Sequence, residues 1–275
     1  MLARITNPRQ RETFKKKYYR MKNKLFRLLL VLLAAVMILP LSAQNKAADS
    51  ILYRRAIQSA MYPEQSKVDT NLVPITKQNP NLTWSKIDGE DYILVVTWKQ
   101  NVSYYQNYID STFYNTGNYP IWVTTAPELK QRMKKEKATN VNRRLLQLLG
   151  LPPNATYSYF VEFWVRPADL FRPCPDKEVT DKRCEICFPA NTDPAHKNWI
   201  NSSRIDRYYQ CDLYQQYPWT ELGYTYDWNP KNKSHIGLSE FVIGANTNIK
   251  VKAVQTTADY LKSNSEKNKG NLFNP

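Results

Sequence analysis

A short apolar run near the N-terminus constrains this chain most, because it determines the compartment in which the rest must fold. The run spans 12 uncharged residues, Leu28 to Leu39. A membrane-spanning helix needs about 20 apolar residues, whereas 10–14 is the length of a signal-peptide core. Basic residues precede the run, and the small residues Ser42 and Ala43 follow it, which is the order of a secretory signal. We therefore predict cleavage after Ala43 and export to the periplasm or beyond. The alternative is an uncleaved N-terminal anchor.

The same pattern divides the chain into four predicted parts. Residues 1–43 form a basic leader and a cleavable signal peptide, in which Met21 is the expected start. Residues 44–80 form an N-terminal helix from Ser50 to Met61 and an extended, peripheral linker. Residues 81–261 form a single globular domain, and 262–275 a polar, disordered tail. No later apolar run is comparable to the signal, so we expect no stable membrane anchor after cleavage.

Charge and composition exclude several classes of function. The whole chain carries +15, but ten basic residues and one acid precede Gln44, which leaves 29 basic and 23 acidic residues and a net charge of +6. That charge on an exported protein does not indicate nucleic-acid binding. Seven glycines and no G-x-G-x-x-G argue against a dinucleotide-binding unit, and only His196 and His235 are available for histidine chemistry. We expect no cofactor and no metal.

Apolar patterning predicts an α+β fold with an antiparallel or mixed sheet and a helical pair packed on it. The first helix begins at a capping box, Thr125 to Glu128. The second begins at Thr139 and ends at Gly150, which supplies a left-handed cap. The strands are expected at 92–98, 119–124, 156–166, 222–228, 238–243 and 249–254, the last of them at a sheet edge.

Four cysteines, Cys174, Cys184, Cys187 and Cys211, allow two interpretations. Four thiolates with one C-x2-C spacing could bind structural zinc. An even number of cysteines in an oxidising compartment instead favours two disulfides. Of the possible pairings we predict Cys174–Cys184 with Cys187–Cys211, because a Cys184–Cys187 bridge would close a tight loop typical of redox motifs. The bridges would hold the irregular segment 166–217.

The strand 156–166 separates its residues by parity, which suggests a candidate ligand surface. Its odd positions, including Phe163, are apolar and predicted to face the core. The even face is mixed and accessible. It carries Glu162, Trp164 and Arg166, with Asp169 in the following loop; Trp219 and Asp227 belong to a second aromatic cluster.

These residues support two hypotheses about function. In the first, a non-catalytic envelope or secreted domain binds an extracellular polymer or glycan through an aromatic face. In the second, the protein is a hydrolase of envelope or polysaccharide substrates that uses Glu162 with a second carboxylate such as Asp169 or Asp227. Two carboxyl groups that converge in one cleft beside Trp164 would favour the hydrolase.

Four stretches carry a resemblance to a known group of proteins. They read RRLLQLLGLPP, FVEFWVRPADLFRPCPD, YPWTELGYTYDW and GLSEFVI, beginning at Arg143, Phe160, Tyr217 and Gly237. Together they resemble an uncharacterised family of bacterial exported proteins. The resemblance implies a bacterial source and one continuous domain, but no activity and no site residues.

Overall fold

A computed structural model describes the backbone of residues 8–262 and the side chains of 17–30 and 46–262. The chain divides into two compact units, Met1–Ile51 and Leu52–Pro275. The first consists mainly of helix α1 (Pro8–Ala60), whose last residues belong to the second unit. Ser50 lies inside α1, where its hydroxyl donates to the Lys46 carbonyl, so it does not begin a separate helix. No helix within the described residues is sufficiently long and apolar to cross a membrane.

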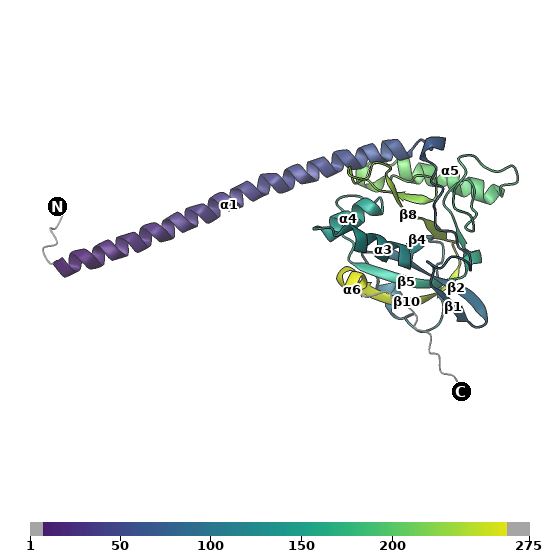
Figure 1. The fold of residues 1–275 in the computed structure, drawn as a ribbon, viewed down its shortest axis with the longest axis horizontal. Coiled ribbons are helices and arrows are strands. Elements are labelled where there is room, and N and C mark those ends of the chain that lie inside the picture. Colours follow the sequence, from purple (N-terminus) through teal and green to yellow (C-terminus); the bar gives the residue numbers. More distant parts are fainter. Residues whose placement is uncertain (1–7, 263–275) are drawn as a thin grey trace, which may run out of the picture. The chain divides into compact units, whose positions relative to one another are not determined.

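An antiparallel sheet forms the centre of the second unit (Figure 1). Its order is β3-β10-β5-β2-β4-β9-β6, and β1 forms a hairpin with β2. The strands are β1 (Trp84–Ile87), β2 (Glu90–Lys99), β3 (Tyr114–Asn115), β4 (Ile121–Thr125), β5 (Tyr159–Val165), β6 (Leu170–Phe171), β9 (Phe241–Ile243) and β10 (Asn248–Thr256). A separate ribbon pairs β7 (Tyr224–Tyr226) with β8 (Ile236–Ser239).

Helices pack on this sheet, most of them on one face, which confirms the predicted α+β class. They are α2 (Ser103–Gln106), α3 (Ala126–Glu136), α4 (Val141–Leu148), α5 (Pro194–Tyr208) and α6 (Thr257–Lys262), with 3-10 turns at Gln65–Lys67, Pro167–Asp169 and Leu213–Gln215. Figure 1 shows α3 and α6 beside β2, β5 and β10. Leu129 of α3 and Tyr260 of α6 pack with Phe160 in one core cluster. On the opposite face, Tyr105 of α2 packs with Phe163 in a second cluster.

Strand β5 is buried on both faces, which contradicts the expectation of an accessible even face. Phe163 is fully buried as predicted, but Glu162 is also only 3% exposed. The two Glu162 carboxylate oxygens pair with Lys130 and Lys252, each at 3.5 Å. The physical reason is that α3 and α6 cover this face, and the two lysines supply the charge that a buried carboxylate requires.

The predicted capping box at the start of α3 does not form. Thr125 occupies the N-cap position, but its side chain does not accept a helix amide. Its hydroxyl donates to the Glu128 carboxylate, which also accepts the backbone amide of Ser239 at 3.0 Å. Glu128 therefore links α3 to the β8–β9 connection. The second helix starts at Val141 with Asn140 as its cap, and Gly150 has the predicted left-handed backbone.

The cysteines follow half of the predicted pairing. Cys174 and Cys184 form a disulfide, which excludes a zinc site with four thiolates. Cys187 and Cys211 are exposed free thiols, so the predicted Cys187–Cys211 bridge is absent. They flank the 15 residues of α5 on opposite sides, and a helix of that length extends about 22 Å. No local pattern in the sequence indicates how far apart the two ends of this helix place the cysteines.

The segment expected to be a peripheral linker contributes to the core. Tyr53 and Ile57 of α1 are buried, as are Leu72 and Ile75 further along. Leu72 packs against the disulfide, and its amide donates to the Lys182 carbonyl. The predicted tail, 262–275, lies outside the described residues except for Lys262, the last residue of α6.

Candidate ligand-binding pocket

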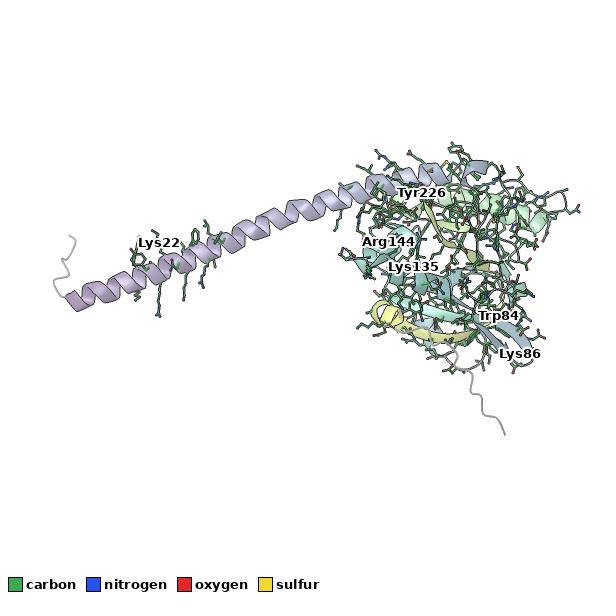
Figure 2. The ribbon with its side chains drawn as sticks, viewed as in Figure 1. Lys22, Trp84, Lys86, Lys135, Arg144 and Tyr226 are labelled. Carbon is green, nitrogen blue, oxygen red and sulfur yellow. A yellow bond between two sulfur atoms is a disulfide. The ribbon has the colours of Figure 1, made fainter. Side chains whose placement is uncertain are left out.

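A cavity of about 260 Å³ opens within the second unit, on the side of the sheet that α3 and α6 cover. Its walls come from the end of β2, from β4, from the loop after α4, from α5 and from β7. Most of the lining is apolar or aromatic, including Trp122 and Tyr226, which is labelled in Figure 2. Three charged side chains also face it, Lys99, Arg207 and Glu240. We refer to this cavity as the Arg207 pocket.

Glu240 lies in the pocket because the chain leaves the two-stranded ribbon and enters the main sheet at this residue. The sequence predicts one strand over 238–243, but the structure has two. Strand β8 pairs with β7, whereas β9 pairs with β4 and β6 in the main sheet. Glu240 is the single residue between them, and its amide donates to the Gly223 carbonyl at 2.8 Å. The preceding residue, Ser239, is held by Glu128.

Burial dominates the protonation of Glu240. Loss of solvation raises the pKa of its carboxyl to about 8, and the nearby Arg207 charge lowers it only in part. Glu240 and Arg207 form no salt bridge within the described residues. At neutral pH the Glu240 carboxyl is therefore mainly protonated, and it does not neutralise the arginine.

Arg207 presents its guanidinium between two aromatic rings. It lies in the last turn of α5, and its carbonyl accepts the Tyr217 amide at 2.8 Å, which fixes the loop that follows. The guanidinium carbon is 5.0 Å from the Trp122 ring centroid and 5.0 Å from that of Tyr217. Its Nε is buried and has no hydrogen-bond partner among the described residues. A buried donor without an acceptor is costly, and the terminal guanidinium nitrogens, which are not buried in this way, are the donors that a ligand carboxylate could reach.

Two further polar groups line the pocket. Burial lowers the pKa of the Lys99 ammonium at the end of β2, and that ammonium forms no ion pair with any described residue. Burial also raises the pKa of the Tyr157 hydroxyl to about 12, with smaller contributions from Tyr217, including a hydrogen bond. Tyr157 therefore remains a neutral donor and acceptor at physiological pH.

The wall opposite these groups depends on close backbone packing. Gly150 has φ +63°, and a Cβ at this position would lie 3.2 Å from the Tyr226 carbonyl oxygen. A glycine at this position therefore lets the chain pass along β7 without backbone strain or a close Cβ contact. Trp228 donates from Nε1 to the Leu151 carbonyl at 3.0 Å, which fixes the same loop.

This arrangement suits binding better than catalysis. Among the described residues, the lining contains one carboxyl group and no Ser, Cys or His, so it has neither a carboxylate pair nor a recognisable activated nucleophile. At pH values below about 8 the pocket has excess positive charge, because Glu240 is neutral while arginine remains charged. A ring with one anionic substituent matches the aromatic walls and this charge.

Only one residue predicted to bind ligand lines the Arg207 pocket. Trp219 does so, but it is 4% exposed and its Nε1 donates to the Pro173 carbonyl. Trp164 is half-buried beneath Lys252, 5.6 Å from its ring centroid. Trp164 therefore lies next to the Glu162–Lys252 pair and away from the pocket lining.

The carboxylates proposed for a hydrolase do not converge. Arg166 and Asp169 pair with each other at 2.7 Å. Asp227 is fully buried, and Arg144 of α4 (Figure 2) binds both of its oxygens, at 2.8 and 2.6 Å. These partners differ from the two lysines that hold Glu162.

Sequence reasoning missed the three charged residues of the pocket. Glu240 had a usable signal, since it is the one charged residue in the run GLSEFVI. Such an acid is either unsatisfied in a strand or marks a break in it. Arg207 and Lys99 had no comparable signal, because a basic residue at or near the end of an element is typical of a solvent-exposed position.

Comparison of the chain with protein-family models, with curated proteins and with solved structures found no match. The resemblance to exported bacterial proteins therefore remains a prediction, and the geometry of the pocket must carry any functional argument.

Proposed function

We propose that the second unit is a non-catalytic binding domain whose Arg207 pocket holds one ring of an acidic glycan. The supporting observation is the Arg207 guanidinium, which lies between Trp122 and Tyr217 with its Nε unpartnered. A sugar ring presents an apolar C–H face that packs on an aromatic ring and a polar rim that hydrogen-bonds. Arginine is suited to a carboxylate on that rim because its guanidinium can make two parallel hydrogen bonds.

The size and charge of the pocket limit the ligand further. Pockets for drug-sized ligands measure about 300–1,000 Å³, and this cavity is about 260 Å³. One ring is therefore the expected occupant. Because Glu240 is protonated at neutral pH, an acidic sugar is favoured over its neutral counterpart.

Calorimetric titration of the purified protein with glucuronic acid and with glucose at pH 6.5 tests this function. We expect glucuronic acid to bind and glucose to bind at least about tenfold more weakly, a difference of about 1.4 kcal/mol. Arg207→Ala should abolish the preference. Arg55→Ala, which removes the same charge from an exposed position on α1, should retain it. Equal binding of the two sugars, or no binding of either, contradicts the proposal.

The hydrolase hypothesis is less well supported. Glu162, Asp169 and Asp227 have separate cationic partners, and the Arg207 pocket offers only Glu240 as an acid. A glycosidase requires two carboxyl groups across one bond. The first hypothesis from the sequence, an aromatic binding surface, is therefore retained with a different set of residues.

We also propose that the chain is exported and cleaved after Ala43. The basic, apolar and small-residue order of residues 22–43 supports this, and so does the Cys174–Cys184 disulfide, because disulfides persist in oxidising compartments. N-terminal sequencing of the exported protein should begin at or near Gln44. A membrane-bound form that begins at Met1 or Met21 contradicts cleavage.

A further inference from the structure

A second cavity, of about 670 Å³, adjoins the Arg207 pocket. Pro120, which precedes β4, lines both of them. The second cavity is bordered by the loop before β6, by the loop after β9 and by the first half of α5. Its aromatic lining includes Phe171 and Trp199.

A row of tryptophans connects the two cavities. Trp122 lines the Arg207 pocket and Trp199 the second cavity, and their ring centroids are 5.9 Å apart with a tilt of 32°. Both rings are half-buried. The buried Trp219 packs edge-on against each of them, at 5.9 and 6.1 Å. Phe171 also packs edge-on against Trp199, at 4.9 Å, so the two rings are held from several sides.

The two cavities differ in charge. In the second cavity Asp169 is paired with Arg166, and Asp193 lies 3.8 Å from Lys177. The cations near it are therefore already matched by carboxylates, in contrast to Arg207. A further anionic ring would gain little here, whereas a neutral ring could use the aromatic surface and the polar rim.

We propose that the two cavities are adjacent subsites for consecutive rings of one glycan, an acidic ring in the Arg207 pocket and a neutral ring on Trp199. The proposal rests on the function proposed above and adds to it the length and the charge order of the ligand. The shared Pro120 and the contact between the Trp122 and Trp199 rings, which are tilted by 32°, connect the surfaces on which the two sugar rings would lie.

Calorimetry with three probes tests the order of the rings. They are glucuronic acid, a hyaluronan disaccharide that joins glucuronic acid to the neutral N-acetylglucosamine, and digalacturonic acid, in which both rings are acidic. We expect the hyaluronan disaccharide to bind about tenfold more tightly than glucuronic acid, a difference of about 1.4 kcal/mol, because its second ring adds a contact with Trp199. Digalacturonic acid should gain less than threefold, on the order of 0.6 kcal/mol.

Variants at Trp199 locate this gain. Trp199→Ala should remove the advantage of the disaccharide over glucuronic acid, with both ligands measured on the same variant. Trp199→Phe, which keeps a flat ring and guards against loss of the fold, should retain part of it. Trp84→Ala serves as a matched control, because Trp84 of β1 (Figure 2) lines neither cavity.

The outcomes separate the two proposals. If glucuronic acid binds and the disaccharide binds no more tightly, the adjacent subsite is wrong and the single-ring function stands. If digalacturonic acid gains as much as the hyaluronan disaccharide, the charge order is wrong. If none of the three binds, both proposals fail.

Discussion

Replacement of Glu240 by glutamine should change how the stability of the protein depends on pH. In the unfolded chain a glutamate titrates near 4.5, whereas burial in the Arg207 pocket raises the pKa of Glu240 to about 8. Between these values the unfolded state binds fewer protons than the folded state, so the free energy of unfolding falls as the pH rises. The contribution is fully present below pH 4.5 and is lost as the pH rises through 8. Glutamine has no such dependence.

The size of this effect follows from the shift. At about 1.4 kcal/mol per pKa unit, a rise from 4.5 to about 8 sets an upper limit of about 5 kcal/mol. The free energy of unfolding of Glu240→Gln, taken relative to wild type, should therefore rise by up to that amount between pH 4.5 and 8.5. Because solvent reaches part of the Glu240 side chain, we expect about 3–5 kcal/mol.

Urea unfolding followed by tryptophan fluorescence at pH 4.5, 6.5 and 8.5 measures the effect. Burial also raises the pKa of Glu128, to about 7, so the wild-type curve alone contains both carboxyls. The difference between Glu240→Gln and wild type isolates Glu240. Glu90→Gln, at an exposed position, should show the same pH dependence of the free energy of unfolding as wild type. A constant difference between Glu240→Gln and wild type refutes the reasoning, because Glu240 would then be ionised in the fold and would neutralise Arg207.

Three further results are expected. Asp227→Asn should lower the free energy of unfolding by about 3–5 kcal/mol, because it breaks a buried bidentate pair with Arg144. Asp169→Asn, in a more exposed pair with Arg166, should cost about 0–1 kcal/mol. Equal effects of the two substitutions in urea unfolding contradict this. Gly223→Ala should lower the thermal midpoint sharply, since φ is +74° and the new Cβ would lie 2.6 Å from Cys184 Sγ; an unchanged midpoint contradicts the packing. Non-reducing peptide mapping should link Cys174 to Cys184 and find Cys187 and Cys211 alkylated; a Cys187–Cys211 peptide contradicts the structure.

The elements of this fold could be predicted where local pattern and burial agree. The apolar run over 92–98 became part of β2, and the leucines after Asn140 became α4, which ends at Leu148, two residues before the left-handed Gly150. In these cases one segment contains the whole signal. The prediction that the odd positions of β5 face the core was also correct for Phe163, which is fully buried.

Features that depend on two distant segments could not be predicted. Glu162 is buried only because α3 and α6 fold over β5 and bring Lys130 and Lys252 beside it. The Arg207 pocket likewise joins β2, α5 and the β8–β9 connection, which are far apart in the sequence. The predicted Cys174–Cys184 disulfide is confirmed, whereas the Cys187–Cys211 pairing was wrong for the same reason, since α5 lies between these two cysteines in the chain.

The central claim is that the Arg207 pocket binds the acidic ring of a glycan. A crystal structure of the protein with glucuronic acid bound tests it most directly. We expect the sugar ring to lie against Trp122 and Tyr217, with its carboxylate within hydrogen-bond distance of the Arg207 guanidinium. A sugar bound elsewhere, or a carboxylate turned away from Arg207 at full occupancy, contradicts the claim.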